Sequence, residues 1–373
     1  MKILIVTDAW PPVTSGVVRT YQTTIRHLKT MGHQIDLITP EQFFTVRCPT
    51  DNQQRLALYA GRKTGRLIEA AQPDAIHVAT EGPLGLAGRN WCVKHSVPFT
   101  TSYTTKLPEY FRARGKIPTP WTYAVMRWFH QPAAGVMVST PTLHNELVQR
   151  GFKNLMRWGR GVDLKLFRPQ PKDFLSAPRP ILMYVGRVAV EKNLEKFLRL
   201  DSPGTKYVVG DGPQLKHLSR KYPDARFVGD MQGEELARYY AAADVFVFPS
   251  RTDTFGLVNL ESMACGVPVA AYPVTGPIDV IQDGVTGALD EDLAKAAWRA
   301  LRIDPKACRE RALRSGWDVS TRQFESNLVP CRDLSAGQFR LAQPKLIFAS
   351  RLVRESALDK ASSSSILPSR TRL

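Results

Sequence analysis

The sequence is poor in cysteine and lacks long apolar runs, and each shortage excludes a class of protein. Its five cysteines are Cys48, Cys92, Cys265, Cys308 and Cys331. They are scattered, odd in number and never spaced as CxxC, which argues against a disulfide framework or a zinc site. No apolar run approaches the ~18–20 residues of a membrane span. The chain runs from Met1 into a strand-like segment without a small-residue cleavage site, so we expect it to be cytoplasmic.

Signatures for metals and dinucleotides are missing as well. The seven histidines show no ligand spacing. Asp290-Glu291-Asp292 has the letters of an Asp-x-Asp metal motif, but it opens a predicted helix, so we interpret it as a helix cap. The first strand-to-helix turn is not GxGxxG, which excludes a dinucleotide fingerprint. We therefore expect neither a metal ion nor another cofactor.

Positive charge, in contrast, is in excess. The chain has 51 Lys and Arg against 34 Asp and Glu, a formal net charge of +17. Residues 331–373 carry eight basic and three acidic residues, so about +12 belongs to residues 1–330. This balance favours an anionic partner: nucleic acid, an anionic membrane surface or a phosphorylated substrate. No RNA-binding or helix-turn-helix motif is present, so we do not expect a nucleic-acid partner.

Short apolar runs alternate with helical patterns along the chain, which predicts α/β domains with parallel sheets covered by helices on both faces. A length of 373 residues suggests about two domains. Prolines cluster at 167–180, as in a linker, between a first domain at 1–166 and a second at 181–316. A closing helix is expected within 317–330. Residues 331–373 are expected to be a poorly ordered basic extension, with a third structured unit as the alternative.

The predicted strands are Ile3–Thr7, Ile35–Thr39, Asp74–Val78, Pro98–Ser102, Gly135–Ser139, Ile181–Val185, Lys206–Val209, Arg226–Val228, Asp244–Phe248 and Val267–Ala271. The clearest predicted helices are Gly16–Met31, Leu84–His95, Pro141–Arg150, Leu293–Leu301 and Ser320–Leu328.

Two strand-to-helix loops contain residues suited to phosphate. In the first, Gly16 permits close backbone approach and the following helix presents its N-terminus to an anion; the alternative is a plain turn capped by Ser15. In the second, Arg187 and Lys192 follow a predicted strand, at the end where open α/β sheets bind ligands. Arginine offers phosphate a bidentate fork and lysine a mobile charge, whereas the alternative is a solvated surface pair.

A third segment combines two carboxylates with a helix start. Asp253 and Glu261 are separated by seven residues, with the start of a predicted helix at 254–257 between them. Backbone amides there can hold a diphosphate, and a carboxylate one or two turns along can accept ribose hydroxyls. The alternative is that Asp253 caps the helix and Glu261 is a surface residue.

Together these segments resemble the retaining glycosyltransferase family 4, over about residues 1–328. The resemblance is carried by Gly186-Arg187…Glu191-Lys192-Asn193, Gly210-Asp211-Gly212-Pro213 and Asp253-x7-Glu261. Within the family, the chain resembles a bacterial branch of lipid glycosyl- and mannosyltransferases, which reads Thr-Asp-Thr-Phe-Gly around the first carboxylate. The resemblance implies the GT-B fold, with two Rossmann-like domains facing across a cleft. The N-terminal domain would bind the acceptor, the C-terminal domain the nucleotide sugar, and the final helix would cross back.

The resemblance also implies roles for individual residues. Asp253 would face the donor sugar, Glu261 would bind the ribose, and Arg187 and Lys192 would bind the diphosphate. Thr104 stands where the family commonly has a histidine, and a threonine keeps a hydroxyl but not the charge or reach. Asp253 replaces the usual glutamate and is one methylene shorter. Further substrate-binding residues implied are Ser15, Gly16, Gly186, Gly210, Asp211, Phe255, Gly256, Leu257 and Val258.

We expect an enzyme that moves a hexose from a UDP- or GDP-sugar to an acceptor with retained α configuration. The acceptor would be a membrane glycolipid precursor, diacylglycerol or an envelope glycan. A sugar-nucleotide 2-epimerase and a catalytically weak nucleotide-sugar-binding sensor stay open as alternatives.

Residues 106–130 interleave basic and aromatic side chains. The basic residues singled out are Arg112, Arg114, Lys116 and Arg127, and the aromatic ones are Phe111, Trp121, Tyr123, Trp128 and Phe129. This mixture suits the surface of an anionic membrane and predicts a reversible, peripheral contact with the inner face of the plasma membrane. The alternative places Trp121, Val125 and Trp128 in the core of the first domain.

Overall fold

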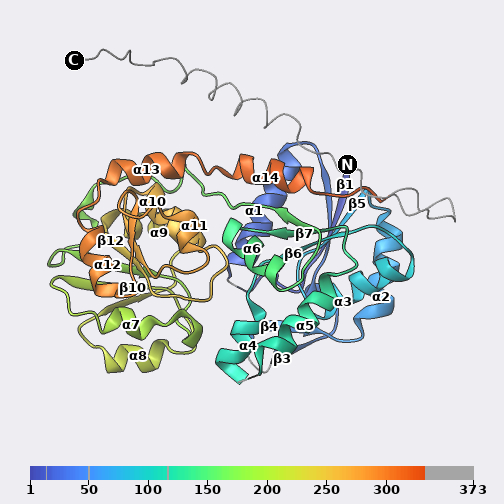
Figure 1. The fold of residues 1–373 in the computed structure, drawn as a ribbon, viewed down its shortest axis with the longest axis horizontal. Helices are drawn as coiled ribbons and strands as arrows, with labels where there is room; N and C mark the ends of the chain where they lie inside the picture. The colour runs from blue at the N-terminus through green and yellow to red at the C-terminus, as the bar shows by residue number, and fades with distance from the viewer. Residues whose placement is uncertain (14, 49–50, 116, 332–373) are drawn as a thin grey trace, which may run out of the picture. The chain divides into compact units, whose positions relative to one another are not determined.

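The computed structural model describes residues 1–331 except 14, 49–50 and 116, and no side chains at 51–54 or 113–115. The predicted extension beyond residue 331 therefore lies outside the described residues. The described chain forms two parallel six-stranded sheets and one two-stranded hairpin (Figure 1).

The first sheet is built around β1, whose apolar residues are buried because helices cover both faces of the sheet. Its strand order is β2-β1-β5-β6-β7-β8. The strands are β1 (Lys2–Val6), β2 (Gln34–Ile38), β5 (Ala75–Val78), β6 (Thr100–Tyr103), β7 (Gly135–Val138) and β8 (Leu155–Arg157). Its helices are α1 (Gly16–Thr30), α2 (Ala60–Ala71), α3 (Pro83–Lys94), α4 (Leu107–Gly115), α5 (Thr119–His130) and α6 (Pro141–Gln149).

An antiparallel hairpin of β3 (Thr45–Cys48) and β4 (Asp51–Ala57) interrupts this alternation after the short turn η1 (Pro40–Gln42). It is not hydrogen-bonded to the main sheet. The sequence pattern did not predict it.

The second sheet has the strand order β11-β10-β9-β12-β13-β14. Its strands are β9 (Ile181–Val185), β10 (Thr205–Val209), β11 (Arg226–Gly229), β12 (Val245–Phe248), β13 (Val269–Ala271) and β14 (Gly287–Leu289). Its helices are α7 (Leu194–Leu198), α8 (Leu215–Lys221), α9 (Gly233–Ala242), α10 (Leu257–Ala264), α11 (Pro277–Val280), α12 (Leu293–Ala300) and α13 (Pro305–Leu313). The order reverses between β9 and β12, and such a reversal is where ligands bind in doubly wound sheets.

The proline-rich segment 167–180 is fastened to the second sheet. Phe167 belongs to that sheet's core cluster, and a short turn, η2 (Lys172–Phe174), packs near α9. Arg179 donates to both oxygens of Asp244, at 2.6 and 2.7 Å.

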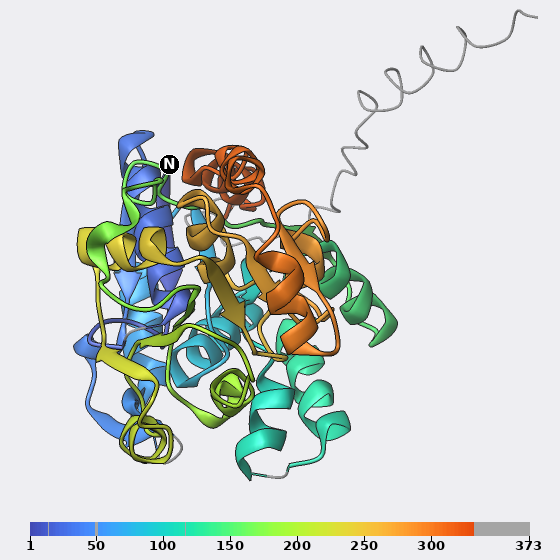
Figure 2. The same cartoon turned by 90° about the vertical axis from the view of Figure 1, so that its left-hand side faces the viewer.

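The last described helix, α14 (Trp317–Ser326), packs against α1 of the first half. Phe324 is fully buried, with its ring centroid 4.8 Å from that of Trp158. His33 and Glu325 meet at 2.9 Å beside it. The two helices are adjacent in Figure 1 and in the turned view of Figure 2.

Candidate functional site

Lys192 and Asp253 meet where the second sheet reverses its order. Lys192 ends the short turn η3 (Val190–Lys192) after β9, and Asp253 lies in the loop after β12. Lys192 Nζ donates to Asp253 Oδ1 at 2.6 Å, and both side chains are about four-fifths buried. Asp253 Oδ2 is buried and has no hydrogen-bond partner among the described residues. The interpretations of Lys192 as a solvated surface cation and of Asp253 as a helix cap are therefore wrong.

Backbone packing explains the glycines of the neighbouring loops. A Cβ at Gly210 would lie 2.0 Å from Gly186 O, so only glycine allows these two strand ends to approach so closely. Asp211 accepts from Val188 N at 2.9 Å through its backbone carbonyl. These contacts give Gly186, Gly210 and Asp211 a structural part in shaping the loop that carries Arg187 and Lys192.

The hydroxyl of Tyr184 holds the loop of Arg187 in place. Tyr184 is buried, and its hydroxyl donates to the backbone carbonyl of Arg187 at 2.8 Å. Burial raises the pKa of Tyr184 well above its ordinary value, so the hydroxyl keeps its proton. Arg187 itself is partly exposed on the same loop.

The N-termini of α1 and α10 adjoin each other. Ser15 accepts from Val18 N at 3.2 Å, which confirms its capping role. A Cβ at Gly16 would lie 3.8 Å from Leu257 Cδ1, the first residue of α10. Gly256 precedes that helix in the left-handed conformation, with φ of +78°. The predicted phosphate loops of the two halves thus lie side by side.

Phe255 and Val258 flank this helix start, and their side chains pack against the core of the second sheet. Their side chains therefore stabilise the helix start by packing.

Glu261, one turn into α10, is buried rather than on the surface, so the surface alternative is wrong. Its Oε1 accepts from Arg19 Nη1 at 2.5 Å, and its Oε2 accepts from Tyr240 at 2.9 Å. The carboxylate raises the pKa of the Arg19 guanidinium. Burial, and then the charge of Glu261, raise the pKa of Tyr240 well above its ordinary value.

Sequence reasoning missed both partners of Glu261. One local signal was present for Arg19, which lies in the first turn of α1, where the helix dipole disfavours a cation. A cation in such a place implies an acidic partner elsewhere in the fold. Tyr240 lies on α9 as one of several buried residues, and its pattern is that of an ordinary core tyrosine.

Thr104 follows the last residue of β6 and lies against the loop that carries Asp253. Its backbone carbonyl accepts from Thr254 Oγ1 at 2.8 Å. Ser139 Oγ, after β7, donates to the carbonyl of Thr254 at 3.0 Å. Nearby, Lys106 Nζ donates to Glu146 at 2.6 Å and to Thr275 at 3.1 Å. The carboxyl ends of the two sheets are thus joined around Asp253.

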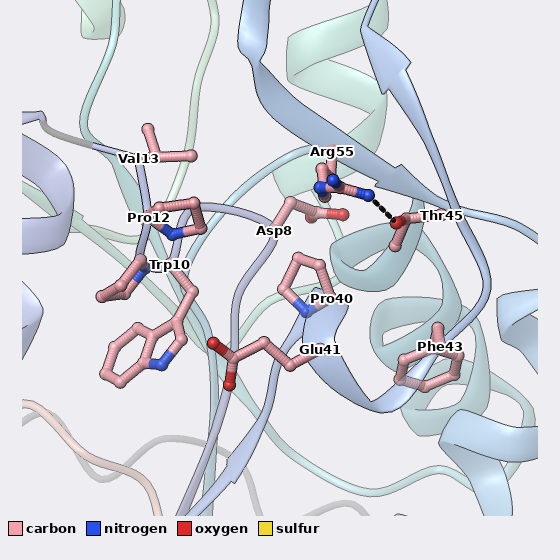
Figure 3. Close-up of a pocket in the computed structure, with 10 residues that line it drawn as sticks. Asp8, Trp10, Pro12, Val13, Pro40, Glu41, Phe43, Thr45 and Arg55 are labelled. Atoms are coloured by element: carbon pink, nitrogen blue, oxygen red, sulfur yellow. Dashed lines mark hydrogen bonds between the residues drawn. The ribbon is translucent and has the colours of Figure 1, made fainter.

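A pocket of about 330 Å³ lies at the carboxyl ends of β1 and β2, under the hairpin (Figure 3). Its lining residues are Asp8, Trp10, Pro11, Pro12, Val13, Pro40, Glu41, Phe43, Thr45 and Arg55. Asp8 is buried and accepts from Leu84 N at 2.8 Å and Gly85 N at 3.1 Å. Burial raises its pKa. Glu41 and Arg55 are exposed and bring opposite charges to an otherwise largely apolar hollow.

One stripe of α5 exposes large apolar side chains. Trp121, Val125 and Trp128 are 72%, 55% and 50% exposed, so placing them in the core was wrong. The opposite side of the helix is buried and includes Tyr123 and Phe129, so the expectation that these two rings face a membrane was wrong. Among the basic residues of this segment, the side chains of Arg114 and Lys116 lie outside the described part.

Asp292 caps α12 by accepting from Ala294 N at 2.9 Å, so its interpretation as a cap is confirmed. Within the described residues, no group of three or more acidic, histidine or cysteine side chains is arranged to hold a metal ion. No helix there has the length and apolar character to cross a membrane.

Comparisons with known proteins match both halves of the chain. Residues 14–166 match the family model described as Glycosyltransferase Family 4, and residues 179–303 match Glycosyl transferases group 1. A sulfoquinovosyl transferase of Arabidopsis thaliana is 30% identical over 84% of this chain and 70% of its own length. A GDP-mannose-dependent alpha-mannosyltransferase of Corynebacterium glutamicum is 31% identical over 78% of this chain and 76% of its own.

A more distant relative is the alpha-monoglucosyldiacylglycerol synthase of Streptococcus pneumoniae, 27% identical over 87% of this chain and 83% of its own. Among solved structures, a sucrose-phosphate synthase of Thermosynechococcus elongatus aligns with a TM-score of 0.68 and 23% identity, over 87% and 97% of the two chains. An Anabaena protein in complex with UDP and glucose aligns with a TM-score of 0.67 and 17% identity, over 87% and 98%. At these identities the likeness concerns the fold.

Proposed function

The chain belongs to glycosyltransferase family 4, has the GT-B fold and transfers sugar from a nucleotide-sugar donor, and from this premise we propose its acceptor and its site. The proposed acceptor is a hydroxyl of a membrane glycolipid precursor or of diacylglycerol. The relative named as an alpha-monoglucosyldiacylglycerol synthase supports a lipid acceptor. We further propose that residues 1–166 serve the acceptor and residues 181–316 the donor.

The observation that carries the donor site is the meeting of Lys192 with Asp253 at the reversal point of the second sheet. In the proposed complex, Lys192 and Arg187 neutralise the diphosphate, and Asp253 faces the hydroxyls of the donor sugar. The buried, unpartnered Asp253 Oδ2 supports that role, since a carboxylate oxygen there accepts a sugar hydroxyl without losing the Lys192 contact. Glu261, one turn into α10, takes the ribose.

Retention of the α configuration follows from a front-face transfer. The acceptor oxygen forms its bond to the anomeric carbon on the face from which the diphosphate departs. The bond between that carbon and the phosphate oxygen breaks, and the departing phosphate takes the acceptor's proton. Glycosylated acceptor and nucleoside diphosphate are the products. Positive charge from Arg187 and Lys192 stabilises the leaving group, so we propose that transfer needs no divalent cation.

The pocket beside the β1–α1 loop supports an acceptor site in the first half of the chain. Val13 lines it, and three residues later Gly16 adjoins Leu257 of the proposed donor site. Apolar surfaces of Trp10 and Phe43 suit the carbon skeleton of an acceptor, while Glu41 and Arg55 suit its hydroxyls. We propose that the acceptor's head group occupies this pocket.

The exposed stripe of α5 supports a peripheral contact with membranes. Trp121 and Trp128 are amphipathic side chains of the kind found at bilayer interfaces, and the excess positive charge of the chain favours anionic lipid. We therefore propose a cytoplasmic enzyme that visits the inner face of the plasma membrane. This places the acceptor pocket and the lipid on the same half of the chain.

The test is a panel of UDP- and GDP-sugars, with and without anionic vesicles containing diacylglycerol, each with and without EDTA. We expect a glycolipid with one donor, formed in the presence of EDTA, and a raised acceptor KM but unchanged donor KM in Trp10→Ala. Release of an epimerised sugar nucleotide without lipid would show that the chain is an epimerase, and the proposed transfer would be wrong. Donor binding without turnover would show that the chain is a nucleotide-sugar sensor. Loss of activity in EDTA that Mg²⁺ restores would show that transfer needs a divalent cation.

A further inference from the structure

Both oxygens of the Glu261 carboxylate already have protein partners. Oε1 accepts from Arg19 at 2.5 Å, and Oε2 accepts from Tyr240 at 2.9 Å. The proposed function asks this same carboxylate to accept hydroxyls of the donor's ribose. A carboxylate has about four lone-pair sites, yet only 5% of Glu261 is exposed, so little room is left for a ligand beside both partners.

Arg19 is the partner that is able to move. Tyr240 is fully buried within the core of the second sheet, so its hydroxyl is fixed by the packing around its ring. The Arg19 side chain is 42% exposed and comes from α1 of the other half of the chain. Its ion-pair partner among the described residues is Glu261, and a cation in the first turn of a helix gains nothing from the helix dipole.

A nucleotide diphosphate would offer Arg19 a better partner than Glu261. Arg19 lies one turn after Gly16, and Gly16 adjoins Leu257 at the start of α10, where the proposed diphosphate site lies. A diphosphate carries more negative charge than one carboxylate and accepts both arms of a guanidinium. Gly16 precedes Arg19, and Leu257 precedes Glu261, by about one helical turn each.

We propose that Arg19 is a positioning residue that passes from Glu261 to the donor's diphosphate when the nucleotide sugar binds. The exchange frees Glu261 Oε1 for the ribose and adds a cation from the first half of the chain to Arg187 and Lys192. It makes the ribose contact and the phosphate contact interdependent. The inference rests on the proposed function, because it takes Glu261 as the ribose carboxylate.

The exchange predicts opposite effects on two ligands that differ only in their phosphates. In Arg19→Gln, UDP or GDP should bind at least tenfold more weakly, because the third cation is lost. Uridine or guanosine should bind as tightly as to the wild type or more tightly, because Arg19 no longer competes for Glu261. Arg19→Lys should recover part of the diphosphate affinity, since it restores the charge but not the fork.

Isothermal titration of the full chain with UDP, GDP, uridine and guanosine measures all four affinities. The matched control is Arg26→Gln, which removes an exposed arginine from the same helix and should change none of them. Circular dichroism melting checks that each variant is folded. The split between diphosphate and nucleoside is the readout that a merely structural role of Arg19 would not produce.

Three results would overturn the inference. Unchanged affinities in Arg19→Gln would show that Arg19 does not touch the nucleotide. Tighter binding of both ligands would make Arg19 a competitor for Glu261 and nothing more. Equal weakening of both would make its role structural. Failure of the wild type to bind either nucleotide is a distinct result, which would overturn the proposed donor site together with this inference.

Discussion

Lys192 and Asp253 are held together across two loops of the second sheet, with Nζ 2.6 Å from Oδ1. Sixty-one positions separate them in the chain, but β9 and β12 are neighbours in the sheet, so their carboxyl ends meet. The pair gives the proposed sugar-facing carboxylate a fixed orientation and sets a cation beside the proposed leaving group. Substitution of either member should therefore impair donor binding or the transfer step rather than acceptor binding.

Removal of the loop cations should weaken donor binding. We expect Lys192→Ala and Arg187→Ala each to lose about 1.5–3 kcal/mol of nucleotide affinity, roughly a ten- to hundredfold rise in Kd, because a charge-assisted contact is lost. Titration with UDP and GDP measures this. Lys196→Ala, which changes an exposed lysine on α7, serves as the control. Wild-type affinity in both loop variants would show that the diphosphate binds elsewhere.

The tryptophans of α5 should govern membrane binding. We expect Trp121→Ala with Trp128→Ala to reduce sedimentation with anionic vesicles several-fold, because amphipathic rings are lost from the interface. Added salt should weaken binding by the wild type, and neutral vesicles should recover less protein. Trp298→Ala removes a 47% exposed tryptophan from α12 and should leave sedimentation unchanged. Equal recovery of the wild type and the double variant would show that the exposed stripe of α5 does not bind membranes.

Substitution of Thr104 should change turnover only modestly. We expect Thr104→Ala to lower kcat measurably, by up to about tenfold, and Thr104→His to equal or exceed the wild type, since an imidazole contact made in the transition state contributes about 1–3 kcal/mol. The contact of its carbonyl with Thr254 involves the backbone and survives both changes. Thr105→Ala is the neighbouring control. Identical rates in all forms would show that Thr104 does not lie in the catalytic cleft.

Buried His77 should make the fold sensitive to acid. Burial lowers its pKa to about 3, while an unfolded histidine titrates near ~6.5. Between these values the unfolded chain binds a proton that the folded chain does not. The free energy of unfolding should therefore fall as pH decreases, by up to ~1.4 kcal/mol per pH unit.

Urea unfolding between about pH 7 and pH 5 measures this dependence. His77→Gln should show a shallower slope than the wild type, whatever its overall stability. His217→Gln, which alters an exposed histidine of α8, should keep the wild-type slope. An undiminished slope in His77→Gln would assign the acid sensitivity to other groups.

Much of the fold could be predicted from the sequence because strands that are buried on both faces have continuous apolar runs. The predicted strand Ile181–Val185 coincides with β9, and the other predicted strands are present with ends shifted by no more than two residues. The hairpin of β3 and β4 escaped prediction because its sequence is largely polar, without the alternation that marks a half-buried strand.

The site was only partly predictable. The loops after β9 and β12 were found because strand ends in a parallel sheet are where ligands bind. The pairing of Arg19 with Glu261 joins residues 242 positions apart, so the local signal at Arg19 implies an acidic partner but does not identify it as Glu261. The pocket of Trp10 and Arg55 was missed for a related reason, since it depends on the unpredicted hairpin.

Sugar transfer by the Asp253→Asn variant most directly tests the central claim, that Asp253 faces the donor sugar during transfer. Labelled donor sugar, with the base that the panel selects, is incubated with anionic vesicles containing diacylglycerol, and label in the lipid is counted. We expect wild type and Asp224→Asn, an exposed control, to transfer alike, and Asp253→Asn to be at least tenfold slower in kcat with donor KM little changed. Equal rates in wild type and Asp253→Asn, or no transfer from any donor by the wild type, would contradict the proposed site.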